Sequence, residues 1–228
     1  MVVDWLRQIR VLTFDCYGTL IDWEGGARET LREIFRGQPL PVSEEEFFRE
    51  WERIQFRLIQ SYRPYREIVA ESFLETCAAL GLDAIPADAH AFAGAIGRWQ
   101  PFPDTRGALA KLHRRAKLAI LSNIDDDIIA ETVKLLGVEF DWIITAQQAH
   151  AYKPSTAPFR LALERIAMQP DAVAHVAFGF EYDIGPAAAL GMKTILVKRT
   201  RVLIPPEPRP DLIVRNLAEL ANDFGGSE

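Results

Sequence analysis

Five short apolar runs, rich in aliphatic and β-branched side chains, recur along the chain. They lie at 11–15, 117–123, 141–146, 173–179 and 193–198. A run that is apolar throughout is typical of a strand buried on both faces, as in a parallel sheet. A further short strand is expected at 211–214. These segments together predict a parallel sheet.

Helical patterns separate the runs from residue 117 onward. Residues 125–137 begin with three aspartates, which suit the positive end of a helix, and end at Gly137. Residues 155–168 begin with a serine cap and carry a proline in the first turn. Strands that alternate with helices in this way form right-handed crossovers. The pattern predicts an α/β core, a Rossmann-like, doubly wound parallel sheet.

A different pattern occupies residues 23–98, where apolar side chains recur at helical spacing and no strand pattern is found. Within 44–62 they stand three or four residues apart, which predicts an amphipathic helix; they are Phe47, Trp51, Ile54, Leu58 and Tyr62. Two further helical segments follow. We therefore predict two domains, an α/β core made of 1–22 plus 99–228 and an inserted, all-helical cap domain made of 23–98.

Polar or small residues stand where three of the predicted strands end. Asp15 ends the first strand, Ser122 and Asn123 end the second, and Gly179 ends the fourth. In open α/β sheets, ligands bind beyond the carboxyl ends of the strands, where the strand order reverses. We expect these ends to open onto one crevice, which a cap inserted just after Asp15 would cover.

Charge and composition narrow the functional classes. The net charge of −6 and the lack of a Lys/Arg cluster argue against a nucleic-acid binder. No run approaches about 18 apolar residues, so no membrane segment is expected, and the first ten residues, which include Asp4, make a poor signal peptide. Cys16 and Cys77 cannot form a disulfide scaffold and fit a reducing compartment. We expect a soluble, cytoplasmic protein.

Four short motifs stand in the order found in a known family. They are FDCYGTL at 14–20, LSN at 121–123, YKPSTAPF at 152–159 and DIGPAAALG at 183–191. Together they resemble the haloacid dehalogenase superfamily of hydrolases over nearly the whole predicted core, and the helical insertion resembles its cap. The resemblance implies that Asp15 is the nucleophile. A carboxylate can attack an electrophilic carbon or phosphorus and form an ester or acyl phosphate that water later opens.

Two positions separate the branches of this superfamily. Its phosphatases carry a second aspartate, an acid/base, two residues after the nucleophile, where this chain has Tyr17. They also carry a Gly-Asp-x-x-x-Asp segment whose acids hold Mg²⁺, whereas here Gly179 stands four residues before Asp183. The 2-haloacid dehalogenase branch has tyrosine at the second position. The resemblance therefore implies a metal-independent hydrolase of small 2-haloalkanoic acids that needs no cofactor.

The resemblance also assigns roles at the centre of the site, and none of these residues is taken as a metal ligand. Asp15 displaces halide from the α-carbon by in-line attack, with inversion. Thr19 resembles a group that orients this aspartate. Lys153 resembles the motif lysine, a fixed positive charge beside developing negative charge. Asp183 resembles the acid that pairs with the lysine and helps to position the hydrolytic water.

Other residues are expected to contact the substrate. Ser122 and Asn123 resemble the groups that orient the nucleophile and the substrate carboxylate, and Tyr17 would form part of the pocket. Dehalogenases usually have a polar Ser-Ser-Asn run before the last aspartate, where this chain has Phe178 and Phe180 around Gly179. We expect Phe178 and Phe180 to border the crevice and to make it more apolar.

Two further departures from the family concern a residue after the motif lysine and an arginine of the cap. Dehalogenases have a tyrosine six residues after the motif lysine, and this chain has Phe159. Their cap arginine, which grips the carboxylate and receives the halide, has no clear counterpart by spacing: Glu45 falls near the expected place, and the neighbours Arg36, Arg49 and Arg53 are the candidate substitutes.

Two alternative functions stay open beside dehalogenation. One is a phosphatase that keeps Mg²⁺ with Asp15, the carbonyl of Tyr17 and Asp183. The other is a non-catalytic protein that binds a small anion in the crevice. The histidines have no metal-ligand spacing and are expected to be structural or solvated; they are His90, His113, His150 and His175. A homodimer is compatible with the resemblance, because dimers are common among such dehalogenases.

Overall fold

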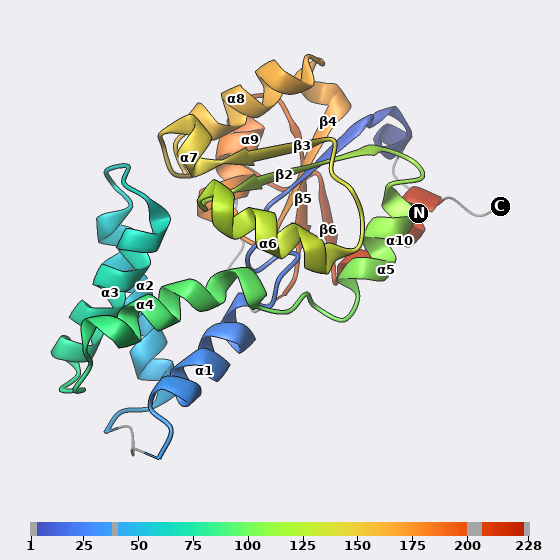
Figure 1. The fold of residues 1–228 in the computed structure, drawn as a ribbon. Coiled ribbons are helices and arrows are strands. Elements are labelled where there is room, and N and C mark those ends of the chain that lie inside the picture. The colour runs from blue at the N-terminus through green and yellow to red at the C-terminus, as the bar shows by residue number, and fades with distance from the viewer. Residues whose placement is uncertain (1–3, 38–40, 200–206, 226–228) are drawn as a thin grey trace.

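The computed structural model describes residues 4–37, 41–199 and 207–225. Within them, a six-stranded sheet has the order β3-β2-β1-β4-β5-β6, and every neighbouring pair is parallel (Figure 1). The strands are β1 Val11–Phe14, β2 Lys117–Ser122, β3 Trp142–Thr145, β4 Val173–Ala177, β5 Lys193–Val197 and β6 Leu212–Val214. Each coincides with a predicted run, and the predicted doubly wound parallel sheet is confirmed.

The middle of the sheet is the place where the strand order reverses. β1 pairs on one side with β2 and on the other with β4, so that Phe14 lies opposite both Ile120 and Val176. All four residues of β1 are fully buried. The segments that follow β1, β2 and β4 therefore emerge side by side at the carboxyl edge, where a crevice is expected in this kind of sheet.

Helices cover both faces of the sheet (Figure 1). Helices α5, α6 and α10 cover the face to which Leu12 and Phe14 point, whereas α8 and α9 cover the face to which Val11 points. The bounds are α5 Thr105–Leu112, α6 Asp126–Leu136, α7 Ala146–Ala149, α8 Ala157–Ile166, α9 Gly185–Ala189 and α10 Leu217–Gly225. As predicted, α6 ends at Gly137, which adopts a left-handed conformation that costs glycine little.

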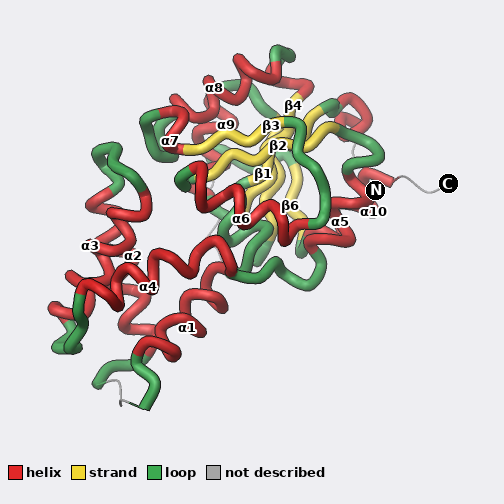
Figure 2. Tube along the Cα trace, viewed as in Figure 1, coloured by secondary structure: helices red, strands yellow, loops and turns green. Residues whose placement is uncertain are grey.

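The segment between β1 and α5 forms a separate group of helices beside the core (Figure 2). They are α1 Trp23–Ile34, α2 Glu44–Leu58, α3 Tyr65–Ala79 and α4 Pro86–Ala95. Side chains cap the first two helices: Asp22 accepts a hydrogen bond from the backbone of Gly25, and Ser43 accepts one from the backbone of Glu46. The group has an aromatic interior in which Phe73 and Phe92 pack at 4.9 Å between ring centroids.

The helical group is joined to the core on two sides. The entering and leaving chains run together, because the backbone N–H of Asp22 donates to the carbonyl of Gln100. On the other side, the carboxylate of Asp125 accepts hydrogen bonds from the first two backbone N–H groups of α3, those of Tyr65 at 2.8 Å and Arg66 at 2.9 Å. An acid from the core thus caps a helix of the insertion, which holds that helix against the carboxyl edge of the sheet.

Helix α2 is shorter than its apolar pattern predicts. It ends at Leu58, and the chain turns before Pro64, which disfavours helical geometry in the residue that precedes it. Tyr62, the last residue of the predicted apolar stripe, packs instead against Tyr152 of the core, with 5.7 Å between ring centroids. No helix in the described ranges is long and apolar enough to cross a membrane.

Candidate active site

The nucleophile proposed from the sequence stands at the start of a tight turn. Asp15 follows β1 directly, and the next residues close the turn through three hydrogen bonds to the carbonyl of Cys16. Gly18 has φ of +97°, and a Cβ there would lie 2.2 Å from the ring of Phe178. Both the backbone angle and the aromatic ring require glycine at this position.

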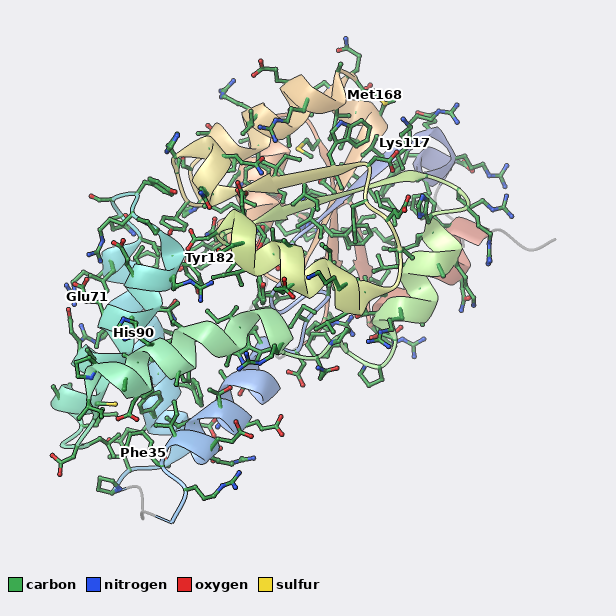
Figure 3. All side chains as sticks on the ribbon, viewed as in Figure 1. Phe35, Glu71, His90, Lys117, Met168 and Tyr182 are labelled. Atoms are coloured by element: carbon green, nitrogen blue, oxygen red, sulfur yellow. The ribbon has the colours of Figure 1, made fainter. Side chains whose placement is uncertain are left out.

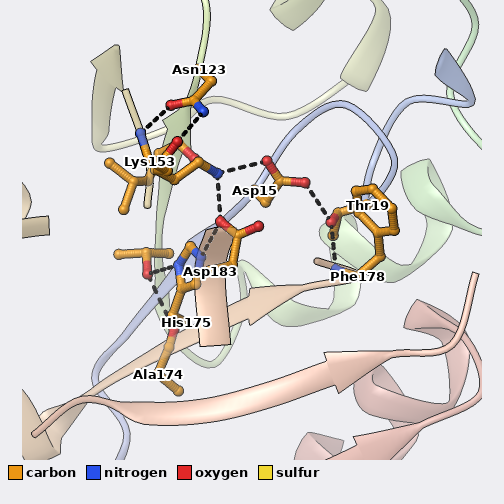
Figure 4. A network of polar contacts seen from close by, with 10 residues as sticks. Asp15, Thr19, Asn123, Lys153, Ala174, His175, Phe178 and Asp183 are labelled. Atoms are coloured by element: carbon orange, nitrogen blue, oxygen red, sulfur yellow. Dashed lines mark hydrogen bonds and ion pairs between the residues drawn. The ribbon is translucent and has the colours of Figure 1, made fainter. Parts of the chain in front are cut away.

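Both carboxylate oxygens of Asp15 accept hydrogen bonds (Figure 4). The ammonium of Lys153 donates to Oδ1 at 2.8 Å, and the hydroxyl of Thr19 donates to Oδ2 at 2.8 Å. The backbone N–H of Phe178 in turn donates to the hydroxyl oxygen of Thr19 at 3.0 Å. The Thr19 hydrogen is thereby directed at Asp15, and the carboxylate is held in one orientation.

Lys153 is a buried cation, 2% exposed, that lies between two acids. Its Nζ is 2.8 Å from Oδ1 of Asp15 and 2.5 Å from Oδ1 of Asp183, and it also donates to the carbonyl of Leu121 at 3.1 Å. Burial alone would lower the pKa of Lys153, but the two carboxylates outweigh burial and raise that pKa above its usual value. The side chain is therefore a permanent positive charge between Asp15 and Asp183.

The backbone of Lys153 is fixed by Asn123. The side-chain oxygen of Asn123 accepts from the N–H of Lys153 at 2.7 Å, and the side-chain amide donates to the carbonyl of Lys153 at 3.0 Å. Asn123 therefore positions the lysine, and it also lines the cavity described below, where contact with the substrate carboxylate stays a prediction. Its neighbour Ser122 is buried and lines the cavity described below.

A histidine that sequence reasoning set aside belongs to this network. His175, on β4, is fully buried, and its Nε2 lies 3.1 Å from Oδ1 of Asp183. Its Nδ1 lies 2.9 Å from the hydroxyl of Thr13, its neighbour on β1. Phe159, which stands where dehalogenases have tyrosine, packs edge-on against the imidazole at 5.2 Å between ring centroids. Figure 4 shows the chain of contacts from His175 through Asp183 to Lys153.

The two acids of the site have opposite pKa shifts. Burial, together with the charge of Asp183, raises the pKa of Asp15 above its usual value, although Lys153 and Thr19 oppose the shift. Burial would also raise the pKa of Asp183, but Lys153 and His175 outweigh burial there and hold this pKa below its usual value. Asp15 is therefore the first of the two to take up a proton as the pH falls, and Asp183 stays ionised.

The aromatic residues expected at the pocket occupy different places. Phe178 and Tyr17 line the cavity, and the hydroxyl of Tyr17 is 2.7 Å from that of Thr132 on α6. Phe180 does not line it. The helical turn Phe180–Ile184 directs the Phe180 side chain into a small apolar cluster with Ala177, Ile184 and Leu196. The expectation that Phe180 borders the crevice is therefore corrected, because the turn carries it to the other side of the chain.

A cavity of about 600 Å³ lies between this network and the helical insertion. The core contributes the polar groups, including Asp15, Ser122 and Lys153, and the insertion contributes residues of α1, α2 and α3. In Figure 3 the labelled Tyr182 of the core lies on the side that faces the helices of the insertion. The carboxyl edge of the sheet and the helical group thus border one site.

Of the three arginines considered as substitutes for a cap arginine, two reach this cavity. Arg49 and Arg53 line it from α2, whereas Arg36 follows the end of α1 and lies away from the lining. Arg53 is bound to Glu50 at 2.5 Å. Arg49 makes no ion pair or side-chain hydrogen bond with any residue that the structure describes. Arg49 is therefore the arginine that is available to an anionic ligand.

The residues of the site fit a divalent metal poorly. Mg²⁺ requires oxygen ligands, and here one oxygen of each acid, Oδ1 of Asp15 and Oδ1 of Asp183, is already bound to the ammonium of Lys153. At Gly179, where the sequence pattern lacks an acid, a Cβ would lie 2.7 Å from Oδ2 of Asp183. In the described ranges, no group of three His, Cys, Asp or Glu residues gathers as a metal site. This donor set suits chemistry in which Lys153 supplies the positive charge.

Comparison with known proteins agrees with the fold and the order of the motifs. A sequence model of the haloacid dehalogenase-like hydrolases matches residues 9–191. The haloacetate dehalogenase H-2 of Moraxella sp. (strain B) is 28% identical over 201 residues, which cover 85% of this chain and 88% of that protein. The (S)-2-haloacid dehalogenase 2 of Pseudomonas sp. (strain CBS-3) is 28% identical over 227 residues, which cover 95% of this chain and 96% of that protein.

Among solved structures, the L-2-haloacid dehalogenase of Xanthobacter autotrophicus with chloropropionic acid covalently bound has a TM-score of 0.81. It is 25% identical to this chain, and the match covers 96% of this chain and all of the other. The extent of the family match, together with the parallel sheet and its helical insertion, establishes the assignment. The chain belongs to the haloacid dehalogenase-like hydrolase family.

Proposed function

We propose that this hydrolase removes halide from 2-halocarboxylates through an ester on Asp15. One observation carries the proposal: a buried ammonium, that of Lys153, lies between an oriented carboxylate, Asp15, and a second acid, Asp183, in the lining of the cavity. The names of the related dehalogenases and the solved complex with covalently bound chloropropionic acid support the same class of reaction.

In the first step, one oxygen of Asp15 attacks the α-carbon opposite the halogen. The new C–O bond forms as the carbon–halogen bond breaks, and the halide leaves with the bonding electron pair. The hydrogen bonds from Lys153 and Thr19 hold the carboxylate in line for this attack, so that little orientational freedom is lost in the transition state. Asp15 is only 6% exposed, which limits competing water around the nucleophile.

In the second step, water attacks the ester carbonyl carbon of Asp15. The bond between that carbon and the ester oxygen, which is bonded to the α-carbon of the substrate, then breaks. This oxygen takes one proton from the water, and a 2-hydroxycarboxylate is released with Asp15 restored. Oδ2 of Asp183 accepts no hydrogen bond from a described residue, so it is free to bind the water and accept the second proton. Lys153 stabilises the negative charge that develops on the carbonyl oxygen.

Arg49 is the group that we assign to the carboxylate of the substrate. It lines the cavity from α2 and has no partner among the described side chains, so a substrate carboxylate does not have to displace another acid. Its guanidinium can form two parallel hydrogen bonds with a carboxylate. This assignment supplies the anion-binding group that the Phe178-Gly179-Phe180 segment does not.

The phosphatase alternative has weaker support. The position that carries the acid/base in phosphatases is Tyr17, and burial raises the pKa of its hydroxyl well above the usual value, so it stays protonated. Chelation separates the two reactions. EDTA is expected to leave halide release unchanged, whereas loss of activity with EDTA and recovery with Mg²⁺ would favour phosphoryl transfer.

The direct test is a search for the ester. The protein is mixed with a panel of 2-haloacids and phosphate monoesters, quenched in acid, and weighed as intact protein. We expect a 2-haloacid to add its carboxyalkyl group, which is the acid without its halogen, to wild type and not to Asp15→Asn. Labelling only by phosphate esters, or no labelling and no halide release with any 2-haloacid, would refute the proposed function.

A further inference from the structure

The cavity is much larger than the acids that the related enzymes are named for. Its volume is about 600 Å³. One water occupies ~30 Å³ in the liquid, so the space would hold roughly twenty waters, whereas haloacetate and 2-chloropropionate are the size of a few waters. A small acid placed beside Asp15 would leave most of the cavity to water. Pockets of several hundred cubic ångströms usually enclose most of a larger ligand.

Aromatic rings line the cavity on both of its sides. Trp23 from α1 and Phe56 from α2 line it on the side of the insertion, and Tyr182 lines it on the side of the core. Phe56 is 49% exposed, which is unusual for a phenylalanine on a helix. It meets Tyr182 edge-on across the gap between insertion and core, with 6.2 Å between ring centroids. Such rings offer edges and faces to a further aromatic ring.

The charged side chains that line the cavity restrict which charged groups a ligand can carry. Glu52 also lines the cavity, and it makes no ion pair or hydrogen bond with a described residue. Its carboxylate repels a second anion placed beside it, so such an anion is disfavoured near Glu52. Arg49 is the one unpaired guanidinium among the described residues that line the cavity. The site therefore suits a substrate with one carboxylate and an uncharged remainder.

On these grounds, and resting on the dehalogenation proposed above, we propose that the substrate is a 2-halocarboxylate whose α-carbon bears an uncharged aromatic substituent. The carboxylate lies at Arg49, the α-carbon at Asp15, and the ring against Trp23, Phe56 and Tyr182. A short aliphatic haloacid makes the first two contacts and lacks the third. The aromatic part thus supplies binding free energy remote from the reacting carbon.

Turnover of matched substrates tests this substrate class. We expect kcat/KM for 2-chloro-3-phenylpropionate to exceed that for 2-chloropropionate roughly tenfold or more, since burial of a phenyl group against apolar walls is worth at least one such factor. The cyclohexyl analogue has nearly the same bulk without a π-system and should lie between them. A 2-chloropropionate value equal to or above the phenyl value, or a cyclohexyl value equal to the phenyl value, would overturn the inference.

A variant of the proposed ring contact gives a second test. Phe56→Ala should lower kcat/KM for the phenyl substrate roughly tenfold and change that for 2-chloropropionate less than about twofold. Ile85→Ala is the matched control, because Ile85 is also an exposed apolar residue of the insertion, 62% exposed, and does not line the cavity. Equal loss with both substrates, or no loss with either, would contradict the contact.

Binding without turnover separates failure of this inference from failure of the proposed function. Trp23, Trp51 and Trp99 line the cavity, so quenching of tryptophan fluorescence reports its occupation. In Asp15→Asn, 3-phenylpropionate should bind roughly tenfold more tightly than propionate. If that preference is found and no haloacid is turned over, the reaction is wrong and the aromatic site stands. If haloacids are turned over without the preference, the reaction stands and the aromatic site is wrong.

Discussion

Replacement of Lys153 by methionine tests the electrostatic arrangement of the site. Methionine keeps much of the length of the side chain and removes the charge between Asp15 and Asp183. Both acids are buried, and they lose the ammonium at 2.8 and 2.5 Å. Removal of one partner from a buried ion pair costs about 3–5 kcal/mol of unfolding free energy, and loss of a preorganised charge costs about 10²–10³ in kcat. We expect both losses at neutral pH.

The dependence of these losses on pH has a definite sign. In wild type the pKa of Asp183 is lowered by Lys153 and His175, so its stabilising contribution exists above the ordinary aspartate pKa and is lost as the pH falls through the lowered value. Without Lys153, burial raises the pKa of both acids, and proton uptake then favours the folded state. The stability gap between wild type and Lys153→Met should therefore narrow as the pH is lowered from about 8 to about 5.

Urea unfolding at several pH values and halide release at neutral pH measure the two effects. Lys134→Met is the matched control, because Lys134 is an exposed lysine paired only with Glu131 on the same helix, and such pairs contribute about 0.5 kcal/mol or less. Full activity of Lys153→Met, or a stability gap that does not change with pH, would refute the reasoning.

Other variants probe separate parts of the site. Asp15→Asn should abolish turnover in a protein that still unfolds cooperatively in urea, because Lys153 keeps its ion pair with Asp183, and retention of more than about a tenth of the activity would exclude a covalent role. His175→Leu should lower kcat about tenfold or more with little change in KM. His175→Gln should restore part of the lost kcat, because glutamine can donate a hydrogen bond to Asp183 as the imidazole does. Equal kcat values in the two variants would show that His175 contributes only by packing. Gly18→Ala should lower the unfolding free energy by about 2 kcal/mol, since a positive φ and the ring of Phe178 both oppose a Cβ, and urea unfolding at wild-type stability would contradict this. The acid limb of kcat/KM should lie above the ordinary aspartate pKa, because the attacking Asp15 must be ionised and burial raises its pKa; an acid limb at the ordinary value would contradict that shift.

The strands and the outline of the site could be predicted from the sequence because both are carried by local patterns. Buried parallel strands are continuous apolar runs, and the residues that follow them meet at one edge. Asp15, Lys153 and Asp183 were recognised within short motifs, and the structure brings all three together. The motifs identify these three residues, and the order of the strands determines only how close together they lie.

The residues that were missed depend on contacts between distant segments. A histidine in the middle of an apolar strand has no local signature, and His175 meets Asp183 because of the turn that follows β4. One signal was present: Thr13 is a polar residue two positions before Asp15, hence on the same face of β1, and it pairs with His175 once β1 and β4 are neighbours. Phe180 was misplaced because its direction is set by a helical turn rather than by strand alternation.

The origin of the oxygen in the product tests the covalent reaction most directly. Excess enzyme is allowed to convert one equivalent of a 2-haloacid in water enriched in ¹⁸O, and both the product and the peptide that contains Asp15 are weighed. An ester on Asp15 predicts that the label enters the carboxylate of Asp15 and that the product hydroxyl carries unlabelled oxygen, because the first oxygen transferred comes from the protein. Label in the product hydroxyl with none in Asp15 would mean that water attacks the substrate directly, and would contradict a nucleophilic Asp15.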